Sequence, residues 1–174
     1  KGIFIMATNL QFIKQASGTS VSTLSITDCF NAKYDVYQVF ISKVDITGLE
    51  WVEFQYLDTS GNALTGTVYD EAVHEMLSYG SFGQGRSTGR DEHGRLARFN
   101  AESYQGVGVT FTVFNPYSSN YTFAKSQSSA MTSSGLFGSK GIFVYKADDV
   151  VAGLKFKLDT QTFDNITVNV YGVK

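Results

Sequence analysis

The chain is 174 residues long, and 43% of its residues are hydrophobic, 14% aromatic and 17% charged, with a formal net charge of -2. This length predicts one domain of ordinary size, and the aromatic content excludes a largely disordered chain. So small a net charge gives no strong basic field, so we expect binding neither to nucleic acid nor to an anionic membrane surface. No apolar run approaches the roughly 18 residues that span a bilayer, so we expect no membrane insertion.

The chain opens with a short apolar run. Ile3, Phe4 and Ile5 precede Met6, and this run is too brief for the hydrophobic region of a signal peptide. Because exposed Ile-Phe-Ile is unfavourable in an isolated monomer, we predict that it packs on the same domain or on a neighbouring subunit. Residues 1–18 are therefore interpreted as an N-terminal arm or edge strand of a single domain that spans residues 1–174.

Alternation of apolar and polar residues is the dominant pattern along the rest of the chain. In residues 50–57, Val52, Phe54 and Tyr56 fall on one face, as in a half-buried strand. The same pattern predicts strands at residues 21–26, 36–41, 107–114, 121–123, 142–145, 154–158 and 166–171. Turns are predicted between them where Asp, Asn, Ser and Gly gather, at residues 58–62, 115–120 and 164–165.

Roughly eight to ten short strands without alternating helices predict two packed antiparallel sheets. We therefore predict an all-β fold, an antiparallel β-sandwich of jelly-roll type, with a closed barrel as the alternative. Residues 69–77 match both the helical and the strand spacing, so periodicity does not decide between them. Residues 146–153 end at a glycine and predict a short helical connector between strands.

The most irregular stretch, residues 79–98, holds five Gly and four Arg, namely Arg86, Arg90, Arg95 and Arg98. Long irregular stretches are uncommon in compact domains and are often functional, so we predict a loop that contacts partners. Its arginines would grip an acidic surface of a partner subunit, with a solvated loop as the alternative. The glycines match neither the dinucleotide-binding spacing nor the P-loop. Residues 126–138, rich in Ser, Gly and Ala, predict a second flexible loop.

No pattern selects a catalytic or metal site. The sole cysteine, Cys29, cannot form a disulfide within the chain, and we expect a buried, unreactive thiol. Two carboxylates could meet across a sheet to cleave a glycosidic bond, but nothing selects a pair. Two groups contain a histidine with acidic neighbours: His74 with Glu71 and Glu75, and His93 with Asp91 and Glu92. Neither group has the spacing of a zinc motif, so we interpret both as surface polar clusters. We expect no enzymatic activity, no metal and no other cofactor.

Many tyrosines fall near the predicted turns. In carbohydrate-binding sandwiches such rings stack on sugar faces, while Asn, Asp and Gln side chains hydrogen-bond the hydroxyl groups. The candidates for glycan stacking are Tyr79, Tyr104, Tyr117 and Tyr121. The alternative is that these rings close the edges of the sandwich with their hydroxyl groups in water.

Segments at the two ends of the chain carry a resemblance to a known class of proteins. They read MATNLQFIK at residues 6–14, VSTLSITDCF at 21–30, YDVY at 34–37 and FDNITVNVYGVK at 163–174. Together they resemble small virion structural proteins of tailed bacteriophages, particularly those that infect marine and freshwater bacteria. The middle of the chain, including the arginine-rich stretch, has no counterpart in this resemblance.

The resemblance implies a non-enzymatic structural protein located in the virion. Such a module would decorate the capsid or form part of the tail or fibre, with copies of itself and other virion proteins as partners. Low charge and predicted β-strands agree with a module repeated on a particle, where multivalency replaces individual affinity. The alternative is a carbohydrate-binding module for host adhesion, with a host surface glycan as its ligand.

Overall fold

The structure is a computed structural model that describes residues 9–46, 48–99 and 108–174. Within these ranges every regular element is a β-strand, which confirms the predicted all-β class, and no helix there could span a bilayer. The strands in chain order are β1 (Leu10–Val21), β2 (Thr23–Ile26), β3 (Val36–Ile46), β4 (Glu50–Leu57), β5 (Tyr69–Leu77), β6 (Gly83–Arg90), β7 (His93–Phe99), β8 (Gly108–Phe114), β9 (Thr122–Thr132), β10 (Gly135–Tyr145), β11 (Gly153–Lys157) and β12 (Phe163–Val173).

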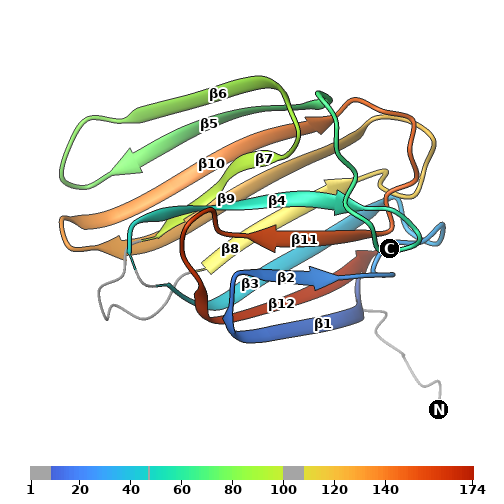
Figure 1. Cartoon of the computed structure of the whole chain (residues 1–174), viewed down its shortest axis with the longest axis horizontal. Helices are drawn as coiled ribbons and strands as arrows, with labels where there is room; N and C mark the ends of the chain where they lie inside the picture. The colour runs from blue at the N-terminus through green and yellow to red at the C-terminus, as the bar shows by residue number, and fades with distance from the viewer. Residues whose placement is uncertain (1–8, 47, 100–107) are drawn as a thin grey trace, which may run out of the picture.

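These strands form two antiparallel sheets that pack on each other as a sandwich (Figure 1). In the described part of the chain, the large sheet has eight strands in the order β1-β12-β3-β8-β9-β10-β5-β6. The small sheet has four, in the order β2-β11-β4-β7. The predicted antiparallel β-sandwich is therefore confirmed, and β1 and β6 are the outer strands of the large sheet.

The alternating pattern accounts for the core between the sheets. Side chains of β9 alternate strictly between exposed and buried, as in a strand with one face on the core. In β4, Val52, Phe54 and Tyr56 are buried as predicted. Gln55 is buried too, because its Nε2 donates to the backbone carbonyl of Asp91, where the chain crosses from β6 to β7. Other large, fully buried side chains in the core are Tyr37, Phe111, Phe156 and Phe163.

The prediction of an irregular loop at residues 79–98 is wrong, because most of these residues form β6 and β7. Two of their five glycines, Gly85 and Gly94, lie where arginine side chains pass close to the backbone. A Cβ added at Gly85 would lie 2.8 Å from Cδ of Arg95, and one added at Gly94 would lie 3.0 Å from Cζ of Arg90. The Gly-rich composition here therefore provides room for close packing between strands.

The flexible loop predicted at residues 126–138 is also wrong, because these residues belong to the β9–β10 hairpin. Ser126 on β9 donates its hydroxyl to the backbone carbonyl of Leu96 on β7, with 3.4 Å between the two oxygens. Across the hairpin, the hydroxyl oxygens of Ser128 and Ser139 lie 2.6 Å apart. The side chains are small because this face of the hairpin packs closely on β7.

Two further local predictions are wrong, whereas the turns predicted at residues 58–62 and 115–120 are confirmed. Residues 146–152 form an irregular connector rather than a helical turn, and Gly153 begins β11. Residues 164–165 lie inside β12, where its register against β3 shifts. The turn at residues 58–62 is confirmed, since Asp58 Oδ1 accepts the backbone N–H groups of Ser60 and Asn62. The ambiguous residues 69–77 form strand β5.

Candidate functional site

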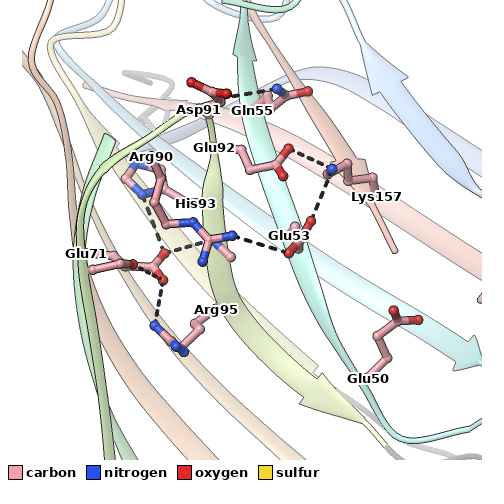
Figure 2. Close-up of polar contacts among 12 residues, drawn as sticks. Glu50, Glu53, Gln55, Glu71, Arg90, Asp91, Glu92, His93, Arg95 and Lys157 are labelled. Carbon is pink, nitrogen blue, oxygen red and sulfur yellow. Dashed lines mark hydrogen bonds and ion pairs between the residues drawn. The ribbon is translucent and has the colours of Figure 1, made fainter. Parts of the chain in front are cut away.

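Two of the four arginines singled out in the sequence are committed to ion pairs within the molecule (Figure 2). Arg90 at the end of β6 places Nη2 3.8 Å from Oε1 of Glu53 on β4. Arg95 on β7 places Nη1 3.1 Å from Oε1 of Glu71 on β5. These two guanidinium groups therefore link the large sheet to the small one.

The other two arginines lie elsewhere. Arg98 on β7 lies over the ring of Trp51 on β4, with its Cζ 5.9 Å from the ring centroid. Arg86 is exposed on the outward face of β6, opposite Ala72 of β5. The structure thus distributes the arginines over both sheets, and a contact with a partner through them stays a prediction.

Glu71 is a buried carboxylate on the inward face of β5, with only 5% of its surface exposed. It accepts hydrogen bonds from Ser87 Oγ at 2.9 Å, the backbone N–H of Gly94 at 2.8 Å and Arg95 Nη1 at 3.1 Å. Burial alone would raise the pKa of Glu71, but its contacts with His93, Ser87 and Gly94 outweigh burial and lower the pKa. The ionised carboxylate therefore anchors β5, β6 and β7 to one another.

His93 lies beside Glu71, fully buried, with its Nδ1 3.7 Å from Glu71 Oε2, which is too long for a hydrogen bond. The rings of Phe54, Tyr69 and Phe143 surround it at centroid distances of 4.5, 4.8 and 5.0 Å. Within the described residues neither ring nitrogen has a hydrogen-bond partner. Burial lowers the pKa of His93 although the Glu71 charge opposes this, so the imidazole is neutral near pH 7.

The interpretation of both histidine groups as surface polar clusters is wrong for Glu71 and His93, which are buried. Because β5 alternates, Glu71 faces the core while His74 faces solvent, so the two cannot share a ligand. In the described ranges no three His, Cys, Asp or Glu side chains are grouped to hold a metal ion. The burial of Glu71 had a sequence signal, since it lies two residues from Tyr69 and from Val73 on one face of the strand.

A second charged group lies next to the first, on β4, β11 and the β6–β7 crossing (Figure 2). Lys157 Nζ lies 3.2 Å from Oε2 of Glu53 and 2.8 Å from Oε2 of Glu92. Burial and the neighbouring Glu92 charge raise the pKa of Glu53. Glycoside hydrolysis needs two carboxylates that face a substrate, but here one ammonium group bridges both. We interpret this group as an ion-pair network that holds the crossing against the small sheet.

The tyrosines named as candidates for glycan stacking lie at opposite ends of the sandwich. Strands β5 and β9 both begin opposite Tyr145 of β10. Tyr117 and Tyr121 precede β9 at that end, with 37% and 47% of their surfaces exposed, whereas Tyr79 follows β5 at the far end and is 42% exposed. These three rings therefore form no common platform, and Tyr104 lies outside the described residues.

The outward face of the large sheet carries a continuous row of apolar side chains, which we call the apolar row. It crosses six neighbouring strands through paired residues, in the order Leu10, Val173, Val36, Phe114, Phe123 and Val144. Leu10 is 41% and Phe123 50% exposed, and the adjacent Phe12 and Ile142 are 55% and 66% exposed. The other four side chains of the row are half-buried, and an apolar row of this kind makes the outward face a candidate interaction surface. The candidate contact residues Ile3, Phe4 and Ile5 lie outside the described residues.

A groove of about 650 Å³ lies on the same outward face, over β10, β5 and β6. The groove centres on two cross-strand triplets, Ile142-Ala72-Arg86 and Lys140-His74-Gln84. Ala72 forms a low floor because long side chains flank it on both neighbouring strands. Arg86 is the residue of these two triplets that the sequence predicts to make contacts. The grouping itself is not predictable, because the register that joins three distant segments is not visible in the sequence.

Cys29 is fully buried, and its Sγ lies 3.4 Å from the backbone oxygen of Ile26. Burial raises the pKa of the Cys29 thiol to about 12, so the thiol stays protonated at neutral pH. A thiolate is the reactive form of cysteine. The prediction that Cys29 is buried is therefore confirmed, and its raised pKa favours the unreactive thiol form.

No family model matches the sequence, and no curated protein matches it. One similar solved structure is a fructofuranosidase from Schwanniomyces occidentalis in complex with fructosylnystose, with 8% sequence identity and a TM-score of 0.23. The match covers 97% of this chain and 35% of that one, so this chain spans about a third of its length. A TM-score this low does not show a shared fold.

Proposed function

We propose that this chain is a non-enzymatic structural protein of a bacteriophage virion, a module repeated on the capsid surface or on the tail or fibre. The observation that carries the proposal is the apolar row on the outward face of the large sheet. Exposure of this row to water is unfavourable, whereas contact with a second copy of the chain buries it. Other virion proteins are the further partners that the resemblance implies.

The strand pairing supports a jelly roll, which is the finer fold that the sequence predicts. When the hairpins β5–β6 and β9–β10 are set aside, eight strands are left. The first of these eight strands pairs with the last, the second with the last but one, and so on. The pairs are β1 with β12, β2 with β11, β3 with β8 and β4 with β7. Jelly rolls occur in viral capsid proteins and in lectins. This support is by analogy, because one fold hosts many functions.

The outward face is also large enough for a stable interface. Eight strands at a spacing of about 4.8 Å give the sheet a width of about 38 Å, and its longer strands have a length of about 36 Å. A standard interface takes about 800 Å² from each partner, which is less than the area of this face. Burial of one large apolar side chain such as Phe123 contributes about 1.5–3 kcal/mol.

The self-association part of the proposal is tested by sedimentation velocity over a range of protein concentrations. We expect the wild-type chain to associate, and Phe123→Ser to weaken the association constant by about tenfold or more, since one lost apolar contact corresponds to about 1.5–3 kcal/mol. Leu49→Ser is the matched control, because Leu49 is 52% exposed but lies in the β3–β4 turn. A strictly monomeric wild-type chain, or equal effects of the two substitutions, would contradict the proposal.

The location in the virion needs a separate test. Electron microscopy of purified particles, together with mass spectrometry of their proteins, should find the chain at regular positions on the capsid, tail or fibre. Absence of the chain from particles would overturn the proposal. The alternative, a carbohydrate-binding module for host adhesion, is supported by the groove over β10, β5 and β6 and not by the tyrosines, which do not converge.

A further inference from the structure

We propose that the groove over β10, β5 and β6 binds a saccharide that carries a carboxylate, such as a uronic acid unit. Arg86 and Lys140 would hold the carboxylate from opposite walls, and the sugar ring would lie over the Ala72 floor. This site goes beyond the proposed structural role, because it needs only one copy of the chain.

The shape of the groove follows from the register of three strands. Ala72 is paired with Ile142 on one side and Arg86 on the other, and His74 is paired with Lys140 and Gln84. Strands β10 and β6 are two strand spacings apart, or about 10 Å. A short floor residue between walls at that separation leaves room for one sugar ring, and the volume of about 650 Å³ lies within the usual range for small-molecule sites.

The two cations of the groove differ from the other basic side chains nearby. In the described part of the chain, neither Arg86 nor Lys140 has a carboxylate within ion-pair distance. The neighbouring basic residues that do have one, at 3.8 Å or less, are Arg90, Arg95, Lys146 and Lys157. Two uncompensated cations that face one groove favour an anion between them.

The nearest acidic side chain on the same face of β5 does not neutralise these cations. Asp70 lies two residues before Ala72, and its carboxylate is bound by Lys146 Nζ at 2.7 Å and by the backbone N–H of Gly89 at 2.8 Å. These contacts lower the pKa of Asp70. Asp70 is therefore paired with Lys146, and no ion pair joins it to Arg86 or Lys140.

The other groups at the groove favour a saccharide over a bare anion. His74 lines the groove, and the ring of Phe82, which is 69% exposed, lies beside it with 5.5 Å between the two centroids. Aromatic rings stack on the apolar faces of sugars. The Gln84 amide offers both a donor and an acceptor to sugar hydroxyls. With a net charge of -2 for the whole chain, the local cations suit one carboxylate better than a polyanion.

The test measures binding of glucuronic acid to the full chain by isothermal titration, with glucose and acetate as comparison ligands. We expect glucuronic acid to bind at least about tenfold more tightly than either comparison ligand, since charge and ring contacts act together. Arg86→Gln and Lys140→Gln should each weaken binding about tenfold or more. Lys155→Gln, which removes the same charge from β11 in the other sheet, should leave it unchanged.

Three results would overturn the proposal. The first is that glucuronic acid does not bind to the wild-type chain. The second is that acetate binds as tightly as glucuronic acid, which would indicate a simple anion site. The third is that the wild-type chain and the groove variants bind glucuronic acid equally. Thermal unfolding of each variant checks that the fold is intact. Sedimentation velocity of Lys140→Gln should match the wild-type chain, so a failure of this site is distinguishable from a failure of self-association.

Discussion

Glu71 keeps its charge inside the sandwich because donors from β6 and β7 reach both of its oxygens. Ser87 and Arg95 donate to one oxygen and the backbone N–H of Gly94 donates to the other. His93, in contrast, is surrounded by aromatic rings, and neither of its ring nitrogens has a hydrogen-bond partner among the described residues. Hydrogen-bond donors around the buried Glu71 thus stabilise its charged form, whereas burial of His93 without hydrogen-bond partners favours its neutral form.

This contrast predicts that the free energy of unfolding falls as the pH falls below about 6.5. The pKa of His93 is lower in the folded chain than in the unfolded chain, so its contribution is complete above the unfolded pKa. Below the unfolded pKa, the unfolded chain binds a proton at His93 that the folded chain does not bind. The free energy of unfolding then falls by up to about 1.4 kcal/mol per pH unit until the pH reaches the folded pKa.

Urea unfolding at a series of pH values measures this dependence. The matched variant is His93→Phe, which keeps an aromatic ring among Phe54, Tyr69 and Phe143 and removes the titrating group. Its stability should fall less steeply in the same pH range. Equal slopes for the variant and the wild-type chain would contradict the assignment to His93. Glu71 titrates in a separate, lower range, because its contribution to stability is complete above the ordinary glutamate pKa of 4.5 and is lost as the pH falls from there through the lowered folded pKa.

At the scale of elements, the sequence predicts those strands whose two faces differ in polarity. Strand β4 was predicted because Val52, Phe54 and Tyr56 alternate with polar residues. Strand β6 is not predicted, because close approach of Arg95 requires Gly85 on its inward face, and glycine carries no periodic signal. The inward face of β9 was missed for a related reason, since Ser, Ala and Thr there pack on β7 without the large apolar residues that mark a core.

Close approach between strands also predicts which glycines are needed for the stability of the fold. Gly153 begins β11, and a Cβ added there would lie 2.6 Å from the backbone oxygen of Ile26 on β2. A backbone atom cannot rotate away, so Gly153→Ala should lower the free energy of unfolding by about 1–3 kcal/mol. Gly108→Ala is the control, because Gly108 begins β8 with nothing within 4 Å of the added Cβ. Urea unfolding of both variants tests this, and equal stabilities would contradict it.

At the scale of the whole molecule, the register between sheet neighbours determines which surface residues meet. The sequence contains Arg86 in a basic stretch and Lys140 in a strand, but their place on one groove depends on β5 lying between β6 and β10. The apolar row likewise joins Leu10 near the start of the chain to Val173 near its end. Sequence periodicity predicts that such residues face outward, whereas their grouping depends on sheet order, which local patterns do not encode.

The chemistry of the apolar row predicts how self-association responds to salt. With a net charge of -2 and apolar side chains at the proposed contact, association should depend on burial of surface and not on charge. Sedimentation velocity at low salt and at about 1 M sodium chloride, where the Debye length is about 3 Å, should give association constants within a few-fold of each other. Sodium sulfate should strengthen association, because excluded salts favour apolar burial. A loss of tenfold or more in sodium chloride would instead show that charged groups hold the copies together.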